Sequence, residues 1–175
     1  MPYRHIFLTG QKQVGKSTIW RTVLADRQYT GFQTIPFHLD GFKRGYTFHS
    51  MIDLPDRLND APCVIRVNEN RHAAVPAVFD GAGAEALRLA LGADCPIILM
   101  DELGKVERNC TAFLDAVTAC LDSGDHHVLG VLQLGEAPMQ QAIRAREDVL
   151  LLTVTEENRG EICRQVEETL RSWGL

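Results

Sequence analysis

The stretch that decides the fold is Gly10-Gln11-Lys12-Gln13-Val14-Gly15-Lys16-Ser17. It follows residues 6–8, a continuously apolar run that predicts a buried strand. It leads into residues 17–26, where apolar residues recur at the spacing of an amphipathic helix. A glycine-bearing turn with the spacing G-x-x-x-x-G-K-S, placed between a strand and a helix, predicts a phosphate-binding loop.

Each residue type in this loop has a physical reason. Gly10 and Gly15 allow backbone turns that a side chain would block, so successive N–H groups can converge on one anion. The following helix directs its positive end toward the same phosphates. We expect the Lys16 ammonium to contact the β- and γ-phosphates. We also expect the Ser17 hydroxyl to bind Mg²⁺ and Thr18 to reach the α-phosphate.

A second segment supports the first. Residues 96–100 form the apolar run PIILM, which ends in Asp101 and Glu102. In an open α/β sheet, ligands lie beyond the carboxyl ends of the strands. We therefore expect Asp101 to hold Mg²⁺, through water, and Glu102 to act as the general base or to position an attacking water. The alternative is that the two carboxylates cap the segment that follows.

The remaining pattern predicts an α/β fold, with a mainly parallel sheet sandwiched by helices. The predicted strands are residues 6–8, 32–39, 46–52, 63–67, 96–100, 127–132 and 149–154, and the predicted helices are residues 17–26, 85–91, 111–121, 139–146 and 159–173. Asn158 is the expected N-cap of the last helix, with Glu161 three residues on. Residues 68–82 carry no clear pattern.

The spacing of the two motifs narrows the class of fold. Lys16 and Asp101 are 85 residues apart, with at least one strand-like segment between them. This separation is typical of phosphate-loop NTPases in which an additional strand lies between the loop strand and the acidic strand, and a catalytic glutamate follows the aspartate. Residues 1–175 are expected to form one domain, with a β-rich insertion at about residues 31–82.

Composition excludes several classes of protein. Hydrophobic residues make up 45% and charged residues 23% of the chain, as in ordinary globular proteins. The apolar runs are too short to cross a bilayer, and five cysteines without a C-x-x-C pair favour reduced thiols. We therefore expect a cytoplasmic protein with no membrane partner. The net charge of −5, without a basic stripe, argues against a nucleic acid partner.

Phosphoryl transfer usually requires a further cation near the transferring group. The candidates are Arg146, which is favoured, and then Arg144 and Arg159. The alternative for Arg146 is a surface ion pair with the acidic residues that follow it. Lys105 lies close to Glu102 in the sequence, so it could contact or orient the substrate.

With these residues, the chain resembles the nucleoside-triphosphatase family typified by a thermophile enzyme, whose vertebrate members are called cancer-related nucleoside-triphosphatase. The resemblance is carried by residues 7–18, Gly31-Phe32 with Arg44-Gly45-Tyr46, residues 101–107 and residues 143–159. The D-E-x-G-K-x-E pattern at residues 101–107 is the specific one. It implies a compact phosphate-loop fold and Mg²⁺-dependent hydrolysis with loose base choice. It also implies the roles given above for Lys16, Ser17, Asp101 and Glu102, and it favours Lys105 and Arg146 as catalytic residues.

The sequence therefore predicts hydrolysis of nucleoside triphosphates, ATP and GTP among them, to nucleoside diphosphate and phosphate. One alternative is a small-molecule or nucleotide kinase, in which residues 31–82 form an acceptor site and Glu102 activates a hydroxyl. Another is a binding module that responds to its nucleotide state and hydrolyses slowly. Departures from the family pattern at residues 33–36 and 74–79 leave base choice, any acceptor and any protein partner open.

Overall fold

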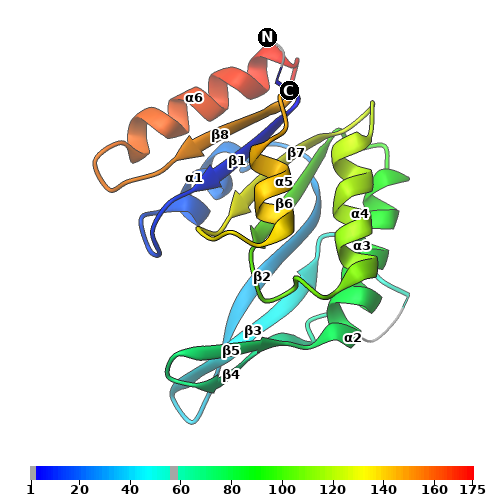
Figure 1. Ribbon diagram of the computed structural model, residues 1–175. Coiled ribbons are helices and arrows are strands. Elements are labelled where there is room, and N and C mark those ends of the chain that lie inside the picture. Colours follow the sequence, from blue (N-terminus) through cyan, green and yellow to red (C-terminus); the bar gives the residue numbers. More distant parts are fainter. Residues whose placement is uncertain (1–2, 56–58) are drawn as a thin grey trace.

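The strands of this protein form one mixed sheet, flanked by helices (Figure 1). The computed structural model describes residues 3–55 and 59–175. Its strands are β1 (His5–Thr9), β2 (Thr30–Leu39), β3 (Phe42–Ser50), β4 (Pro62–Asn68), β5 (Arg71–Ala74), β6 (Ile97–Leu103), β7 (His127–Leu132) and β8 (Val149–Thr153). Its helices are α1 (Lys16–Val23), α2 (Pro76–Val78), the π-helical turn η1 (Phe79–Gly83), α3 (Ala84–Leu91), α4 (Thr111–Asp122), α5 (Pro138–Arg144) and α6 (Arg159–Ser172).

The order of strands in the sheet is β5-β4-β3-β2-β6-β7-β1-β8. Strands β2, β6, β7, β1 and β8 are parallel to their neighbours in this order, whereas β2 to β5 are joined by antiparallel pairing. Strand β7 lies between β1, which precedes the glycine-bearing loop, and β6, which carries the two carboxylates. The predicted α/β fold with an additional strand at this place is confirmed.

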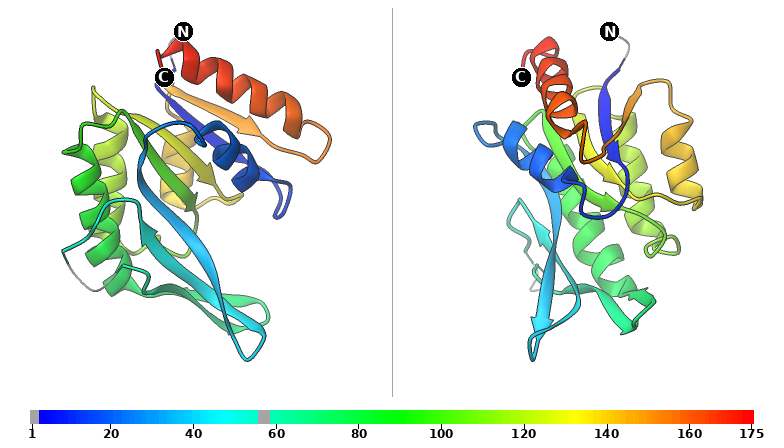
Figure 2. Two further views of the ribbon diagram at one scale, coloured as in Figure 1. Left: turned by 180° about the vertical axis from the view of Figure 1, so that it is seen from behind. Right: turned by 90° about the vertical axis from the view of Figure 1, so that its left-hand side faces the viewer.

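Two layers of helices bury the parallel strands from opposite sides. The view along the edge of the sheet shows α1 and α6 on one face and α3, α4 and α5 on the other (Figure 2). Side chains alternate between the layers, since Ile6 and Leu8 pack toward α1 and α6 while Phe7 packs toward α3 and α4. This explains the continuously apolar strands, because both faces of such a strand are buried.

An antiparallel extension, β2 to β5, continues the sheet beyond the parallel strands. Only Thr30–Phe32 of β2 pair with β6, and the rest of β2 runs on past the carboxyl end of β6 to pair with β3. Gly31 makes this junction possible, because its φ is +96° and an added Cβ would lie 2.0 Å from the carbonyl oxygen of Leu99. The predicted pair of strands with a glycine-containing turn is confirmed, with the turn at Asp40-Gly41.

The structure assigns one stretch that the sequence left open and corrects one expectation. The unassigned residues 68–82 contain β5, α2 and most of η1, and Pro76 begins α2. Asn158 does not cap α6 with its side chain. Instead its Oδ1 accepts a hydrogen bond from the amide of Thr155 (2.8 Å), and its Nδ2 donates to the carbonyl of Thr153 (2.9 Å). The side chain is used to close the loop after β8, and this leaves it unable to bond the helix amides.

The cysteines and the helices bear on the remaining expectations. All five cysteines are free, and burial raises the pKa of the Cys63 and Cys120 thiols to about 12. Within residues 3–55 and 59–175, no helix combines the length and apolar character needed to cross a bilayer.

Candidate active site

The glycine-bearing loop joins the end of β1 to the start of α1. Gly10 and Gly15 have φ values of +132° and +103°, a region that L side chains rarely adopt. A Cβ on Gly10 would lie 2.3 Å from the carbonyl oxygen of Val154, the residue after β8. Glycine is therefore required both for the turn and for the close approach of the neighbouring chain. The predicted strand, loop and helix are present in that order.

Lys16 reaches across this loop. Its Nζ donates to the carbonyl of Gly10 (2.9 Å) and to that of Gln11. Burial lowers the pKa of the Lys16 ammonium, while the charge of Glu102 opposes that shift. Lys16, after β1, and Glu102, at the end of β6, therefore both lie at the carboxyl edge of the parallel strands.

Asp101 lies beside α1 and β2. Its side chain is buried, and its Oδ2 accepts a hydrogen bond from the amide of Thr34 (3.4 Å). Burial and the neighbouring Glu102 raise the pKa of Asp101 to about 6, against the opposing influence of the Thr34 amide, the Trp20 indole and the Arg21 guanidinium. Trp20 stands three residues after Ser17 on α1, so Asp101 lies beside the helix that carries the other predicted metal ligand.

Glu102 has an unusual backbone. Its φ is +74°, a strained value for a residue with a side chain. The strain coincides with an irregularity in the pairing of β6 with β7, between Met100 and Leu103. Such a bulge takes a residue out of the alternation of the strand and re-aims its side chain. The Glu102 carboxylate accepts a hydrogen bond from Nε2 of Gln133 (2.7 Å).

Gln133 is a site residue that the sequence reasoning missed. It follows β7 directly, and its amide donates to the carbonyl of Leu103 (2.8 Å). Its own carbonyl accepts from Nε2 of Gln140, a residue that is 1% exposed (2.7 Å). A Cβ on Gly104 would lie 2.0 Å from Oε1 of Gln133, so the glycine after β6 makes room for this side chain. A polar residue at the carboxyl end of a buried strand was the available signal.

The turn after Glu102 explains the last residues of the D-E-x-G-K-x-E pattern. Glu107 is buried and accepts a hydrogen bond from the amide of Gly104, and burial raises the pKa of its carboxyl. It therefore shapes the turn. Lys105 lies on the same turn, and its side chain is exposed, unlike the buried side chain of Glu107.

Arg146 lies away from the loop, at the amino ends of the strands. Its guanidinium donates to Asp148, which precedes β8 (2.8 Å), to Asp122 (2.7 Å) and to the carbonyl of Leu121 at the end of α4 (2.8 Å). These partners hold its charge at the edge opposite to the loop. The structure corrects the expectation for Arg146, because it does not bring this arginine to the predicted site. Arg144 donates to the carbonyl of Gly135 (2.6 Å).

Arg159 is the arginine that meets the loop. It begins α6, immediately after the loop that the Asn158 side chain closes. A Cβ on Gly15 would lie 2.5 Å from Cδ and 3.0 Å from Nη1 of Arg159. The aliphatic stem of Arg159 therefore covers the last glycine of the loop, and its guanidinium lies at the start of α1.

Comparisons with known proteins show the family of this chain. A family model described as NTPase matches residues 5–167. The nucleoside-triphosphatase THEP1 of Methanosarcina barkeri (strain Fusaro / DSM 804) is 32% identical over 163 residues, which cover 88% of this chain and 90% of the relative. The cancer-related nucleoside-triphosphatase of Homo sapiens is 24% identical over 185 residues and 97% of each chain.

Solved structures share the fold. The solution structure of a human cancer-related nucleoside triphosphatase superposes with a TM-score of 0.76 at 23% identity, over 97% of this chain and 98% of that one. The crystal structure of THEP1 from Aquifex aeolicus gives a TM-score of 0.72 at 20% identity, over 93% and 96%. By the match of its sequence to the family model and to the archaeal relative, the chain belongs to the NTPase family.

Proposed function

We propose that this chain hydrolyses nucleoside triphosphates, ATP and GTP among them, to nucleoside diphosphate and phosphate with the help of Mg²⁺. The observation that carries the proposal is the placement of the glycine-bearing loop after β1 and of Asp101 and Glu102 at the end of β6, at the same edge of the parallel strands with only β7 between them. The names of the sequence relatives, all nucleoside-triphosphatases, support the same activity.

The residues at this edge fit a divalent cation. Asp101 is a buried carboxyl whose pKa is raised by burial and by a second carboxylate, so a cation beside it would favour its ionised form. Hard cations such as Mg²⁺ take oxygen ligands, and we assign this role to the Asp101 carboxylate and the Ser17 hydroxyl. When bound, the metal would neutralise part of the phosphate charge.

The loop binds and orients the triphosphate in this proposal. The amides of residues 10–18 and the positive end of α1 surround the phosphates. The Lys16 ammonium contacts the β- and γ-phosphates and offsets their negative charge. Arg159 adds positive charge at the start of α1. These groups act most strongly on the charge that develops during transfer.

Glu102 is assigned the role of general base, which accepts a proton from the attacking water. A water attacks the γ-phosphorus in line, the bond from this phosphorus to the β–γ bridging oxygen breaks, and the electron pair leaves with the diphosphate. The water proton passes to the Glu102 carboxylate. The hydrogen bond from Gln133 fixes the direction of that carboxylate, and the strained backbone at residue 102 keeps it out of the strand alternation.

Phosphate release tests the proposal directly. We expect release from ATP, GTP, CTP and UTP that stops when the metal is chelated. Glu102→Gln should lower turnover by about 10²–10⁴-fold while nucleotide binding is retained, because only the proton acceptor is lost. Lys16→Ala should weaken triphosphate binding measured by calorimetry. Glu168→Gln, an exposed change of the same kind on α6, is the matched control.

Two results would contradict the proposal. Turnover in the chelated protein equal to that with Mg²⁺ would remove the metal from the reaction. Release that requires an added hydroxyl compound would instead identify a kinase, in which that hydroxyl takes the place of water.

A further inference from the structure

One face of the antiparallel extension carries most of the exposed apolar side chains of this chain. Within residues 3–55 and 59–175, six large apolar side chains are exposed. One of them, Leu134, lies in the loop after β7. The other five are 38% to 66% exposed and lie on the adjacent strands β2, β3 and β4, namely Ile35, Leu39, Phe42, Ile65 and Val67. Single apolar residues on a surface need no explanation, whereas several on neighbouring strands mark a site of interaction.

The register of the strands places these side chains on one face. Phe37 lies opposite Gly45, and Gly45 lies opposite Ile65, so the three residues share a face of the sheet. The half-buried ring of Phe37 lies across Gly45, because a Cβ on this glycine would be 2.9 Å from Cε1 of the ring. Side chains alternate along a strand, so Ile35 and Leu39 lie on the same face as Phe37.

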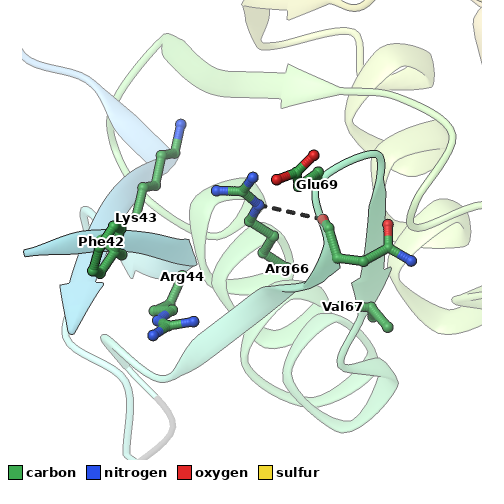
Figure 3. Close-up of a pocket in the computed structure, with 7 residues that line it drawn as sticks. Phe42, Lys43, Arg44, Arg66, Val67 and Glu69 are labelled. Carbon is green, nitrogen blue, oxygen red and sulfur yellow. Dashed lines mark hydrogen bonds between the residues drawn. The ribbon is translucent and has the colours of Figure 1, made fainter. Parts of the chain in front are cut away.

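The ends of the hairpins keep this division between the two faces. Phe42 lies opposite Leu39 where β2 meets β3, so both belong to the same face. In Figure 3, the side chain of Val67 projects from the same side as Phe42, whereas Lys43 and Arg66 project from the other side. We call the following six residues the apolar face: Ile35, Phe37, Leu39, Phe42, Ile65 and Val67.

The apolar face continues a face of the sheet that is buried elsewhere. Gly31 of β2 pairs with Leu99, which packs toward α1 and α6, and Ile35 follows on the same face. Helices α1 and α6 lie over the parallel strands, and the extension runs on beyond them (Figures 1 and 2). The exposed fractions show that no segment within residues 3–55 and 59–175 buries this end of the face.

The exposed area of this face matches the apolar part of a stable interface. At their exposed fractions, the five exposed residues present about 450–500 Å², which lies high in the range of about 300–600 Å² for the largest patch on a monomer. A standard interface buries about 800 Å² on each partner, and about 56–65% of this area is apolar. The apolar face therefore supplies the apolar area that one side of such an interface requires.

A second copy of this chain fits this face better than other occupants. Two twisted sheets can pack face to face with interdigitated side chains, and a twofold axis brings the same surface of each copy together. Asp40 lies in the β2–β3 turn, and the Arg44 guanidinium lies 5.7 Å from the centre of the Phe42 ring. The end of the face thus carries one charge of each sign. A copy with the same residues can neutralise both charges, whereas an anionic lipid surface would repel Asp40.

We propose that the apolar face is the interface of a homodimer of this chain, in which the two extensions pack sheet against sheet. Burial of the exposed rings and aliphatic side chains of both copies drives the association. The loop after β1 and the carboxylates of β6 belong to the parallel strands, so each copy keeps its own candidate active site. The interface therefore goes beyond the proposed hydrolysis and does not depend on it.

The molar mass of the full chain over a dilution series tests this interface. Sedimentation equilibrium without nucleotide should show a monomer–dimer equilibrium. Phe42→Ser and Ile65→Thr each remove apolar surface at an exposed position, and each should weaken the dimer by at least about tenfold, because a symmetric interface loses the side chain twice. Leu134→Ser is the matched control, since Leu134 is 52% exposed but lies outside the extension, and it should leave the dimer unchanged.

Three results would overturn the proposal. The first is a monomer at every concentration up to about 0.1 mM. The second is a dimer that keeps its full strength in both face variants, because such a dimer would use another surface. The third is a monomer that floats with vesicles of phosphatidylcholine and phosphatidylserine and loses this binding in Phe42→Ser, which would identify a lipid-binding face. Urea unfolding of both variants distinguishes a weakened interface from a loss of structure, and Ile65→Thr keeps a β-branched residue in the strand.

Discussion

Apolar side chains are buried in the parallel strands and largely exposed in the antiparallel extension. Every residue of β1 is buried, as are Ile97–Met100 of β6. In the extension, large apolar side chains stand open to solvent, namely Ile35, Leu39, Phe42, Ile65 and Val67. The same sheet is thus covered by helices at one end and uncovered at the other (Figure 1).

This difference separates two tasks. Around the parallel strands, Lys16 is held by loop carbonyls, Asp101 by the Thr34 amide and Glu102 by the Gln133 side chain. The extension instead leaves charged and apolar side chains exposed on its hairpins. The two parts meet at Gly31, where β2 leaves the parallel strands. Changes at the junction should therefore affect the whole molecule, and changes at the tip only the extension.

The largest expected difference between the two regions is seen when alanine replaces one glycine in each, at the junction and at the hairpin tip. Gly31→Ala places a Cβ 2.0 Å from the Leu99 carbonyl at a φ of +96°, so we expect a loss of about 3–5 kcal/mol in the free energy of unfolding. Gly41→Ala meets no atom within 4 Å, and only its φ of +78° is unfavourable, so we expect a loss of about 1–2 kcal/mol. Urea unfolding measures both. Equal losses would show that β2 does not depend on close approach to β6.

A buried histidine in the parallel part should give the next largest effect. His5 Nε2 bonds the carbonyl of Leu121 (3.0 Å) and Nδ1 accepts from the amide of Val128 (3.0 Å), so the ring is neutral. Burial lowers the pKa of His5 to about 4. The unfolded chain, with its ordinary pKa near 6.5, then binds more protons between pH 4 and 6.5. Stability is fully present above pH 6.5 and falls by about 3 kcal/mol as the pH drops to 4.

Measuring that slope requires a reference. Asp101 acts in the opposite sense, because a pKa raised to about 6 favours the folded state as the pH falls below 6. Unfolding curves of His5→Gln retain the Asp101 contribution, so the difference from the native chain isolates His5. His72→Gln in the extension is the matched change and should alter the slope little. A native slope equal to that of His5→Gln would contradict the assignment.

Periodicity and motifs predicted the parallel part well, because its structure is encoded locally. The strand at residues 127–132 has the predicted bounds, and the loop with its flanking strand and helix follows the motif. Residues 68–82 were beyond this reasoning. Their Asn, Pro and Gly residues give no strand pattern, yet the stretch contains the short strand β5. This strand is stabilised by pairing with β4, a tertiary contact that local sequence does not encode.

The candidate site could be outlined in part for the same reason, and the roles of its residues stay predictions. Lys16, Asp101 and Glu102 are specified by their motifs, and these motifs lie at strand ends. The choice between Arg146 and Arg159 depends on tertiary placement, since β8 must lie beside β1 before Arg159 can cover Gly15. Arg146 is held by Asp148, only two residues on, and this local pair was the alternative that the sequence offered.

Gln133 offers a sharper test of how rigidly the parallel part holds its chemistry. Gln133→Ala removes the donor that fixes the Glu102 carboxylate, so we expect kcat to fall by about 10–100-fold with little change in KM. Gln165→Ala, an exposed change on α6, should leave both constants unaltered. Addition of Glu102→Gln to Gln133→Ala should cost little more than Glu102→Gln alone, because the two residues act as a unit. Full additivity, or an effect confined to KM, would rule out positioning by Gln133.

Two arginines at opposite ends of the parallel strands give the finest comparison. Arg159→Ala removes a cation beside Gly15, so we expect triphosphate affinity to fall by about tenfold at unchanged stability. Arg146→Ala breaks partly exposed ion pairs with Asp122 and Asp148, so we expect about 1 kcal/mol less stability and unchanged affinity. Calorimetry and urea unfolding on both variants separate the effects. A larger loss of nucleotide affinity in Arg146→Ala than in Arg159→Ala would contradict this assignment. The phosphates would then depend on a charge at the amino ends of the strands, the edge opposite to the loop.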